Sequence, residues 1–550
     1  MGARGFATAQ KRGVHIQTIK TKLQVASIFS DQMVLQQAKP VPVWGTGTNG
    51  TMVTVSIQGQ SAKACITDGC WKVTLPPLQP GGPFELVVQG KSEGAGQGDE
   101  ERIVCTDVLV GEVWIAAGQS NMEQQLLFTE DCVQEAETGT PAQSGAAQIR
   151  FFTIPRRPFE GAVVPGWHFI GARSEEAAWQ PCTPETALRF SAIGYYFAKR
   201  LQPGRGVPVG IVCCAFGGTP IEAWMDDRVL EDDRRFQPLI EAYREKAGRI
   251  SATEYEAVYA DYVRAADRMI EERGDVEGRV RQLGLDGYRD WVKEHPLLWP
   301  APPMGPKHPQ RPGGLYRAML RTVVPFAVRG VLWYQGESNV GAPHLYADLL
   351  SAMIGNWRRD WETPDLPFLL VQLPAYLPGG QAGGTNWAEL REAQRRTAAD
   401  IPHVAMVVAL DCGEASDIHP VRKQPIAERL ALAAQAVVYG EDASYEAPEC
   451  IAMEITGARV RLTFDSRGGG LRTGDAAATG HGGHARLTGF TLSGADGVYC
   501  EADAELLDPT TVAVWCDSVE RPHSVRYAWN DWPAYSLFGL NGVPVGPFAI

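Results

Sequence analysis

The N-terminal part of the chain alternates apolar and polar residues with a period of two. Over 53–57 and again over 71–75 every second side chain is apolar, so one face of each segment is suited to burial. A Pro-Gly-Gly-Pro cluster at 80–83 precedes another apolar run at 84–88. Short alternating segments between Gly and Pro turns are typical of antiparallel sheets, and here they predict a β-sandwich over 24–106.

The same period returns at the other end of the chain. Apolar residues alternate over 460–464 and 512–516, which predicts a β-rich C-terminal region over 446–550. Between these segments, a Gly-rich stretch carries His481 and His484 at a spacing seen in metal sites. No further ligand cluster accompanies them, so we expect a surface loop.

A different pattern fills the middle of the chain. Apolar runs of strand length alternate with stretches of helical periodicity such as 187–201 and 425–438. This alternation is typical of a parallel sheet covered by helices, and it predicts an α/β core over 107–445. Ligand sites of such sheets lie at the carboxyl ends of the strands. The predicted strands are Val108–Ala117, Val207–Ala215, Val328–Tyr334, Pro367–Leu373 and His403–Leu410.

The segment 226–300 interrupts this alternation of strands and helices. Seven residues recur there at helical spacing, with charged residues on the opposite side: Tyr255, Val258, Tyr259, Tyr262, Ala266, Met269 and Ile270. We therefore expect a packed helical insertion rather than a functional stripe of aromatic residues.

Composition narrows the classes of function. The 550 residues are 44% apolar and 21% charged, which is ordinary for a globular chain of several domains. The net charge of −13, without a basic patch, disfavours nucleic acid as a partner, and no apolar run is long enough to span a membrane. Residues 1–23 are basic but lack the apolar segment of a secretory signal. We expect a tail on a soluble protein, with its compartment and oligomeric state left open.

The eleven cysteines are dispersed along the chain and include no CxxC pair. This spacing predicts neither a disulfide framework nor a zinc site, so we expect no metal and mostly free thiols. Cys65 and Cys70 are close enough in sequence to pair across a strand connection.

The first two predicted strands of the core end in residues that suit ester chemistry. Ser120 follows the first strand in the sequence Gly118-Gln-Ser-Asn-Met122. A sharp turn there can expose its hydroxyl and direct its backbone N–H into a cleft, and a nucleophile needs both. Gly217 and Gly218 follow the second strand, and paired glycines let backbone N–H groups approach a ligand closely. Either sequence alone is also typical of a simple turn or a helix cap.

Polar side chains also follow the third predicted strand. The sequence Trp333-Tyr-Gln-Gly-Glu-Ser-Asn339 places Gln335, Glu337 and Asn339 directly after a buried run. A helix cap is the alternative interpretation. At this edge of a parallel sheet, we expect the three side chains to face a site.

The fifth predicted strand is followed by an acid and a histidine. Asp417 and His419 stand two residues apart, and in an extended segment such residues lie on the same side. Asp417 can therefore orient the His419 imidazole, as the acid of a Ser-His-acid set does. A neighbouring carboxylate favours the imidazolium, so we expect a raised His419 pKa and activity that climbs from slightly acidic pH.

Taken together, these motifs resemble a known family. In this order, Gly118-Gln-Ser-Asn-Met122, Trp333-Tyr-Gln-Gly-Glu-Ser-Asn339 and Asp417-Ile-His-Pro420 are similar to the sialate O-acetylesterase family of SGNH-type carbohydrate esterases. Similar segments extend from about residue 24 to the C-terminus. They are Phe29-Ser-Asp-Gln-Met-Val-Leu35, Val41-Pro-Val-Trp-Gly45, Leu390-Arg-Glu-Ala-Gln394 and Val525-Arg-Tyr-Ala-Trp529.

The resemblance implies an SGNH hydrolase core flanked by β-domains, acting as a serine esterase on O-acetylated sugars. It implies Ser120 as nucleophile, His419 as general base and Asp417 as orienting acid, with no metal or organic cofactor. The backbone N–H groups of Ser120 and Gly218 would form part of the oxyanion hole.

The third motif departs from the Gly-x-Asn-Asp sequence of simpler SGNH enzymes. Which of Gln335, Glu337 and Asn339 completes the hole therefore stays open, and Glu337 could instead serve as a second acid near the histidine.

Other functions fit parts of the same pattern. An acetyl-xylan or other neutral-glycan acetylesterase would use the same residues, as would a lipase or thioesterase. A non-catalytic carbohydrate-binding protein would use the 15 tryptophans for stacking on sugar rings. A sialate site should offer a cation to the substrate carboxylate, and Arg311, Arg317 and Arg391 flank the motifs.

Overall fold

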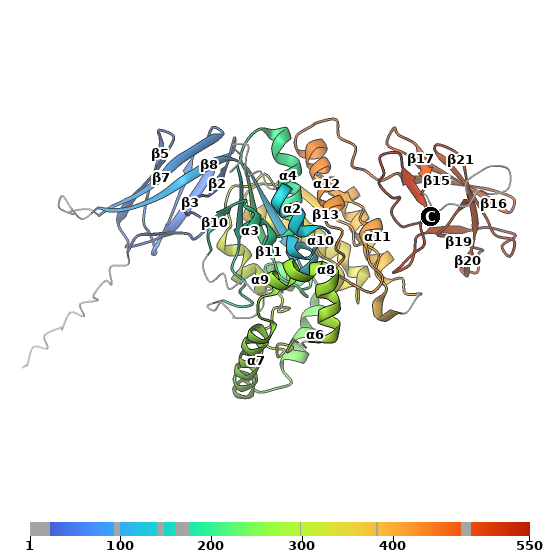
Figure 1. The fold of residues 1–550 in the computed structure, drawn as a ribbon, viewed down its shortest axis with the longest axis horizontal. Coiled ribbons are helices and arrows are strands. Elements are labelled where there is room, and N and C mark those ends of the chain that lie inside the picture. The colour runs from blue at the N-terminus through green and yellow to red at the C-terminus, as the bar shows by residue number, and fades with distance from the viewer. Residues whose placement is uncertain are drawn as a thin grey trace, which may run out of the picture.

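The computed structural model describes residues 22–92, 100–139, 148–160, 177–296, 299–380, 383–474 and 486–550. The expected tail over 1–23 lies almost wholly outside the described residues, as do His481 and His484. Figure 1 shows strands at both ends of the chain and a body of mixed helices and strands between them. The fold is thus mixed α/β, with a large mixed sheet and a β-rich C-terminal region.

Parallel strands form the centre of the large sheet, in the order β9-β11-β8-β12-β13-β14, and the short β10 pairs antiparallel with β9 at the edge. The chain adds β9 and β11 on one side of β8 and then crosses to β12 on the other, which creates a switch point where ligands bind in such sheets. All five predicted strands are confirmed, whereas β9 and β10 were not predicted. The bounds are β8 (Glu101–Gly118), β9 (Ile149–Thr153), β10 (Trp179–Pro181), β11 (Val209–Ala215), β12 (Gly330–Tyr334), β13 (Phe368–Val371) and β14 (Val404–Val407).

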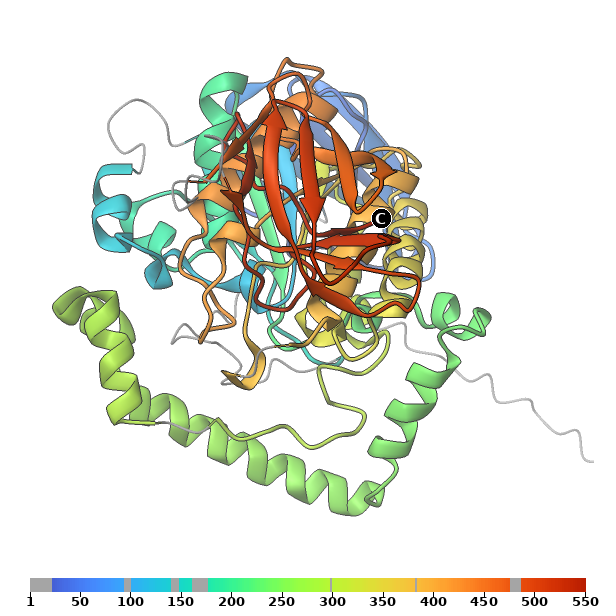
Figure 2. The ribbon, with the colours of Figure 1, turned by 90° about the vertical axis from the view of Figure 1, so that its right-hand side faces the viewer.

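Two pairs of helices cover this sheet. Helix α4 (Ala192–Arg205) packs against α12 (Gln424–Ala433), and α10 (Pro343–Asp360) packs against α11 (Asn386–Asp400). In Figure 2 the first pair, in teal and orange, and the second pair, in yellow to pale orange, lie on opposite sides of the strands. Helix α10 buries an apolar stripe that includes Tyr346, Leu350, Met353 and Trp357.

Strand β8 belongs to two parts of the molecule. Residues 101–110 pair antiparallel with β7 (Gly81–Ser92), and residues 112–118 pair in parallel with β11. The boundary expected between 106 and 107 therefore falls inside one continuous strand.

The other N-terminal strands form the rest of this part of the large sheet and a separate sheet of order β1-β3-β6. Cys65 and Cys70 lie here and are not bonded to each other. The bounds are β1 (Gln24–Val25), β2 (Val34–Gln36), β3 (Val41–Thr46), β4 (Thr51–Ile57), β5 (Gln60–Cys65) and β6 (Cys70–Leu75).

The C-terminal β-strands form a separate apolar core. Arg391 of α11 joins them to the body, because its guanidinium donates to the main-chain oxygens of Leu373 and Pro374 in the body and of Asn530 and Asp531 in the C-terminal region. The principal sheet has the order β15-β16-β22-β21-β18. These strands are β15 (Glu449–Thr456), β16 (Arg459–Asp465), β22 (Thr511–Trp515), β21 (Asp503–Asp508) and β18 (Arg486–Leu487).

The remaining C-terminal strands form a sheet of order β20-β19-β23-β25 and the pair β17-β24. Their bounds are β17 (Leu471–Thr473), β19 (Phe490–Ser493), β20 (Tyr499–Glu501), β23 (Ser524–Tyr527), β24 (Leu537–Gly539) and β25 (Phe548–Ala549).

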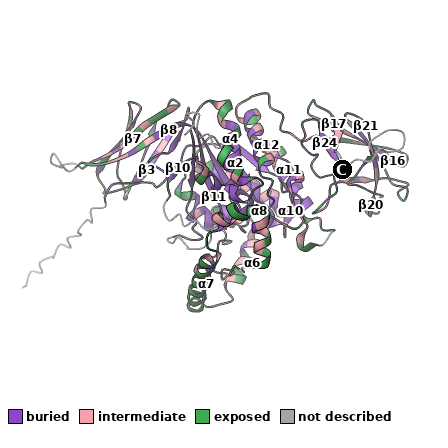
Figure 3. Cartoon of the chain, viewed as in Figure 1, coloured by how far each residue is buried: buried purple, intermediate pink, exposed green. Residues whose placement is uncertain are grey.

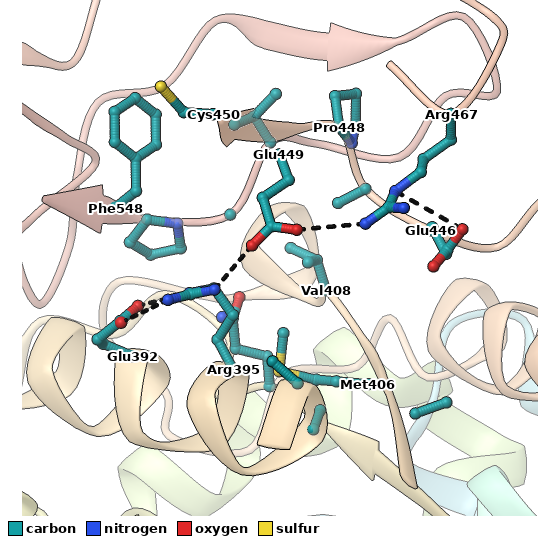
Figure 4. A pocket seen from close by; sticks show the side chains of 18 of the residues that line it. Glu392, Arg395, Met406, Val408, Glu446, Pro448, Glu449, Cys450, Arg467 and Phe548 are labelled. Atoms are coloured by element: carbon teal, nitrogen blue, oxygen red, sulfur yellow. Dashed lines mark hydrogen bonds and ion pairs between the residues drawn. The ribbon is translucent and has the colours of Figure 1, made fainter. Parts of the chain in front are cut away.

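A cavity of about 290 Å³ lies where the C-terminal region meets α11 and β14. Figure 4 shows that an ion-pair chain crosses it: Arg395 pairs with Glu392 and Glu449, and Glu449 also pairs with Arg467. None of the predicted catalytic residues lines this cavity.

The segment 227–294 forms a series of helices that we call the helical arm: α5 (Asp227–Asp232), α6 (Gln237–Ala247), α7 (Ala252–Arg273) and α8 (Val276–Glu294). In Figure 1 α7 projects from the body while α8 lies against it, and Figure 2 shows the arm, in green to yellow-green, running beneath the body. Figure 3 shows that α7 is exposed along much of its length. The buried side of α7 carries Tyr255, Tyr259 and Tyr262, as the helical spacing predicted, whereas Val258 of the same predicted stripe is 41% exposed.

Candidate active site

The first three motifs follow three neighbouring strands that end at the same level. Gly118 at the end of β8 is in register with Ala215 of β11 on one side and Tyr334 of β12 on the other. The residues that follow these three positions therefore meet at one edge of the sheet. This is the edge at which the parallel arrangement predicted a site.

Ser120 stands at the start of α1 (Ser120–Glu123), two residues beyond the end of β8. The turn requires glycine before it: Gly118 has a φ of 144°, and a Cβ there would lie 2.0 Å from the main-chain oxygen of Tyr334. The backbone N–H of Gln119 donates to that same oxygen at 3.1 Å. Ser120 is 8% exposed, so its hydroxyl lies in a recess rather than on an open surface.

The glycines after β11 lie against the serine. A Cβ on Gly217 would come within 3.3 Å of Ser120 Cβ, and the Gly217 N–H donates to Glu123 Oε2 at 2.9 Å. Glu123 is held in turn by an ion pair with Arg156, whose pKa is lowered to about 9 by burial. Gly218 has a φ of 70° and open space where a Cβ would stand, and its carbonyl oxygen accepts a hydrogen bond from Gln310 Nε2 at 2.8 Å.

The third motif forms a buried hydrogen-bond network. Gln335 is fully buried, and its amide nitrogen lies 2.7 Å from Asn339 Oδ1 and 3.1 Å from Gln119 Oε1. Asn339 Oδ1 also accepts the Ile221 N–H, while Asn339 Nδ2 donates to Glu222 at 3.0 Å. These bonds hold the turns after β8, β11 and β12 in fixed positions.

Asn121 connects the serine turn to the histidine loop. Its Nδ2 donates to the main-chain oxygen of Ile418 at 3.0 Å and to Glu337 Oε1. Its Oδ1 accepts a hydrogen bond from Lys423 Nζ at 2.6 Å. Because Asn121 follows Ser120 and Ile418 precedes His419, the structure brings the serine turn and the histidine loop into direct contact.

Asp417 lies beside His419, as their spacing predicted. Asp417 Oδ1 accepts the backbone N–H of His419 at 2.8 Å and lies 3.7 Å from His419 Nδ1. The alternative acids have other partners: Glu337 bonds to Asn121, and Glu414 accepts the Val421 N–H at 2.8 Å. Asp417 is therefore the carboxylate with the shortest described contact to the imidazole.

The expected rise in the His419 pKa is wrong. Asp417 does favour the imidazolium, but burial and the charge of Lys423 outweigh it and lower the His419 pKa to about 4. Burial likewise lowers the pKa of Lys423 to about 7 and raises that of Glu337. The sequence reveals the neighbouring carboxylate but not the burial that dominates.

The three arginines that flank the motifs have partners within the protein. Arg391 is fully buried, and its guanidinium donates hydrogen bonds to main-chain oxygens rather than facing a space that a substrate could enter. Arg311 and Arg317 both pair with Glu160. The structure thus assigns Arg391 a structural role, while Arg317 pairs with Asp227 as well as Glu160, so that two carboxylates face the two arginines.

Sequence reasoning missed three residues around the site. Lys423 lies four positions after His419, at the start of α12, and its nearness in sequence to the predicted base is a signal that could have revealed it. Asn121 stood inside a recognised motif but received no role. Arg289, which reaches Asp417 from the helical arm, carries no local signal in the sequence.

The described ranges of the chain lack two kinds of feature. Within them, no three His, Cys, Asp or Glu side chains gather in a way suited to holding a metal ion. None of the helices there combines the length and the apolar character that a membrane crossing requires.

Comparison with known proteins assigns the family. The model of a family described as carbohydrate esterase, sialic acid-specific acetylesterase, matches residues 110–259 and 306–434. Sialate O-acetylesterase of Rattus norvegicus is 28% identical, over 76% of this chain and 73% of its own, and that of Homo sapiens is 27% identical, over 77% and 72%.

The crystal structure of a carbohydrate acetylesterase from Xanthomonas citri is similar over 96% of this chain and 99% of its own, with 32% identity and a TM-score of 0.72. These likenesses make the chain a carboxylic ester hydrolase of the carbohydrate esterase class. Within that class, the chain belongs to the family of sialic acid-specific acetylesterases.

Proposed function

We propose that this chain removes acetyl groups from O-acetylated sugars on an SGNH-type core, with Ser120 as nucleophile, His419 as base and Asp417 as orienting acid. The observation that carries the proposal is the hydrogen bond from Asn121 to Ile418, because it joins the serine turn to the histidine loop. Membership of an acetylesterase family supports an acetyl ester as substrate. A recessed serine on a turn that contacts the histidine loop, with a carboxylate beside the imidazole, supports acyl transfer.

Each half-reaction moves one proton through His419. In the first, His419 takes the Ser120 hydroxyl proton as the oxygen attacks the acetyl carbonyl carbon. The bond to the sugar oxygen then breaks, and the imidazolium protonates that oxygen, which leaves an acetyl-enzyme. In the second, water gives its proton to His419 and attacks the acetyl group, so that acetate leaves and Ser120 regains its proton. These steps call for neither a metal nor an organic cofactor.

The oxyanion hole combines two backbone donors and one side chain. The Gly217 N–H is bonded to Glu123, so we assign the donor after β11 to the backbone N–H of Gly218. The Ser120 N–H supplies a second donor. We assign the third to the second hydrogen of Asn339 Nδ2, whose first hydrogen is donated to Glu222, because Asn339 is 7% exposed whereas Gln335 is fully buried. Glu337 is bonded to Asn121 and acts on the serine turn instead.

Two substrate classes fit this site. The curated relatives are sialate O-acetylesterases, which favours O-acetylated sialic acid. Acetylated neutral glycans such as acetyl-xylan are the second candidate, favoured because Arg391 is bonded to main-chain oxygens and Arg311 and Arg317 are paired with Glu160. A neutral sugar needs no cation, whereas the sialate carboxylate calls for one.

Acetate release tests the proposal directly. We expect release from O-acetylated sialic acid, from acetylated xylo-oligosaccharides or from both, and the ratio of the two kcat/KM values decides the substrate class. The dependence of the rate on acyl length distinguishes an acetylesterase from a lipase or thioesterase. A faster rate on the octanoate ester than on the acetate ester of the same alcohol would favour the lipase or thioesterase. Sugar binding without acetate release would favour the non-catalytic alternative.

The pH dependence should follow the His419 imidazole. The imidazole accepts a proton only when neutral, so kcat/KM should rise with pH through about 4 and be level at neutral pH. Replacing Lys423 with methionine removes a charge that lowers the His419 pKa, so the rise should move to higher pH. Kinetics on an acetate ester between pH 3.5 and 9 measure both positions.

Arg422→Met is the matched control, because Arg422 bonds to the main-chain oxygen of Asp411 and not to the serine turn. It should leave the midpoint of the pH profile in place. A wild-type midpoint at or above the ordinary histidine value of about 6.5 would contradict the expected lowering by burial.

A further inference from the structure

Arg289 links the helical arm to the predicted catalytic acid. From α8, its Nη2 donates to Asp417 Oδ2 at 3.0 Å and lies 3.2 Å from Glu414 Oε2. The Arg289 side chain is 29% exposed and that of Asp417 is 37% exposed, so the pair is partly shielded from water. Charge-assisted hydrogen bonds of this kind are stronger than neutral ones and fix geometry.

The two oxygens of Asp417 have separate partners. Oδ1 accepts the backbone N–H of His419 and faces the imidazole, whereas Oδ2 is held by Arg289. Rotation of the carboxylate would break one of these bonds or the other. Arg289 therefore sets the direction in which Asp417 presents Oδ1 to His419.

Helix α8 is itself anchored to the body. Tyr288, next to Arg289, packs on Phe128 with ring centroids 6.0 Å apart, and Glu277 at the other end of α8 pairs with Arg189 at 2.8 Å. Between these anchors, Gly284 adopts a φ of 72° and kinks the helix, which lets its second half lie along the body. Arg289 is thus carried by a fixed element rather than by a loose surface helix.

All of α8 lies outside the residues that match the family model, which end at 259 and resume at 306. We propose that Arg289 is a positioning residue for ester hydrolysis, by which the helical arm holds Asp417 in its working orientation. This inference rests on the proposed function, since it takes Asp417 as the acid that supports His419.

A direct role for Arg289 in binding a substrate carboxylate is the competing interpretation. Its charge is shared between Asp417 and Glu414, and Glu414 is fixed in turn by the Val421 N–H. A guanidinium held by two carboxylates attracts a third only weakly. Positioning predicts a loss in kcat, whereas substrate binding predicts a rise in KM.

The test is the kinetics of Arg289→Met on an acetate ester, per folded enzyme as judged by circular dichroism. We expect kcat to fall about tenfold or more with KM within twofold, the factor that a hydrogen bond between charged groups is worth. Arg281→Met is the matched control, because Arg281 lies on the same helix and pairs with Glu277. It should leave kcat unchanged.

A double variant shows whether Arg289 acts through Asp417. In the Asp417→Asn background, Arg289→Met should cost little further rate, because the carboxylate that it orients is already absent. The inference is overturned if Arg289→Met keeps kcat within twofold, if the loss falls on KM, if Arg281→Met loses as much, or if the two losses add. Failure of the proposed function has a different signature: Asp417→Asn or Ser120→Ala alone would then leave the rate intact.

Discussion

Replacing Ser120 with alanine should reduce acetate release by about 10⁴-fold or more, the largest effect that we expect for any single change. Without the hydroxyl no acetyl-enzyme forms, so only the oxyanion donors and substrate binding remain to accelerate attack by water. The side chain is small and lies in a recess at the start of α1, and the alanine variant should therefore fold normally. Acetate production from an acetylated sugar over hours, at high enzyme concentration, measures the activity that remains.

Ser351→Ala is a suitable control, because the Ser351 hydroxyl only bonds to the main-chain oxygen of Ala347 within α10. It should keep the full rate. Acetate release by Ser120→Ala at the wild-type rate would remove the serine mechanism, although the chain would remain an esterase by family.

Replacing Asp417 with asparagine should lower kcat steeply, by up to about 10⁴-fold, with KM little changed. The amide retains the size of the carboxylate but cannot stabilise the imidazolium, and it loses the ion pair with Arg289. The substitution weakens the contact between Asp417 Oδ1 and His419 Nδ1, which are 3.7 Å apart. Steady-state kinetics on one acetate ester separate the two constants.

The other two carboxylates near the site serve as comparators. Glu414→Gln and Glu337→Gln should cost less than Asp417→Asn, because Glu414 fixes the loop and Glu337 holds Asn121 without a described contact to the imidazole. An Asp417→Asn variant near full rate, beside a collapsed Glu337→Gln or Glu414→Gln, would show that the acid was misassigned.

The sequence could predict the core strands because each is a run of apolar residues buried on both faces, as in β11 and β12. The motifs could be expected to meet because parallel strands end at one edge. Strand β9 was not predicted because its buried Arg150 interrupts the apolar run. Helix α11 escaped because its buried face includes Arg391 and Gln394, so apolar periodicity is weak.

Long-range contacts set the limit of prediction at the site. Asn121 meets Ile418 across 297 residues, and Arg289 meets Asp417 across 128. No local sequence pattern indicates either of these long-range contacts. The predicted direction of the His419 pKa shift was wrong for the same reason. The sequence shows the nearby Asp417, whereas burial and the approach of Lys423 are properties of the packed molecule.

The continuity of β8 has a consequence for how this chain can be divided and recombined. The strand begins among the N-terminal strands and ends at the turn that carries Ser120. A crossover between relatives near residue 106 would splice that strand from two parents and disturb register on both sides. At the other end, the chain runs from 440 to 448 without a helix or strand before β15 begins. Exchange of modules is therefore favoured at the C-terminal junction and opposed at the N-terminal one.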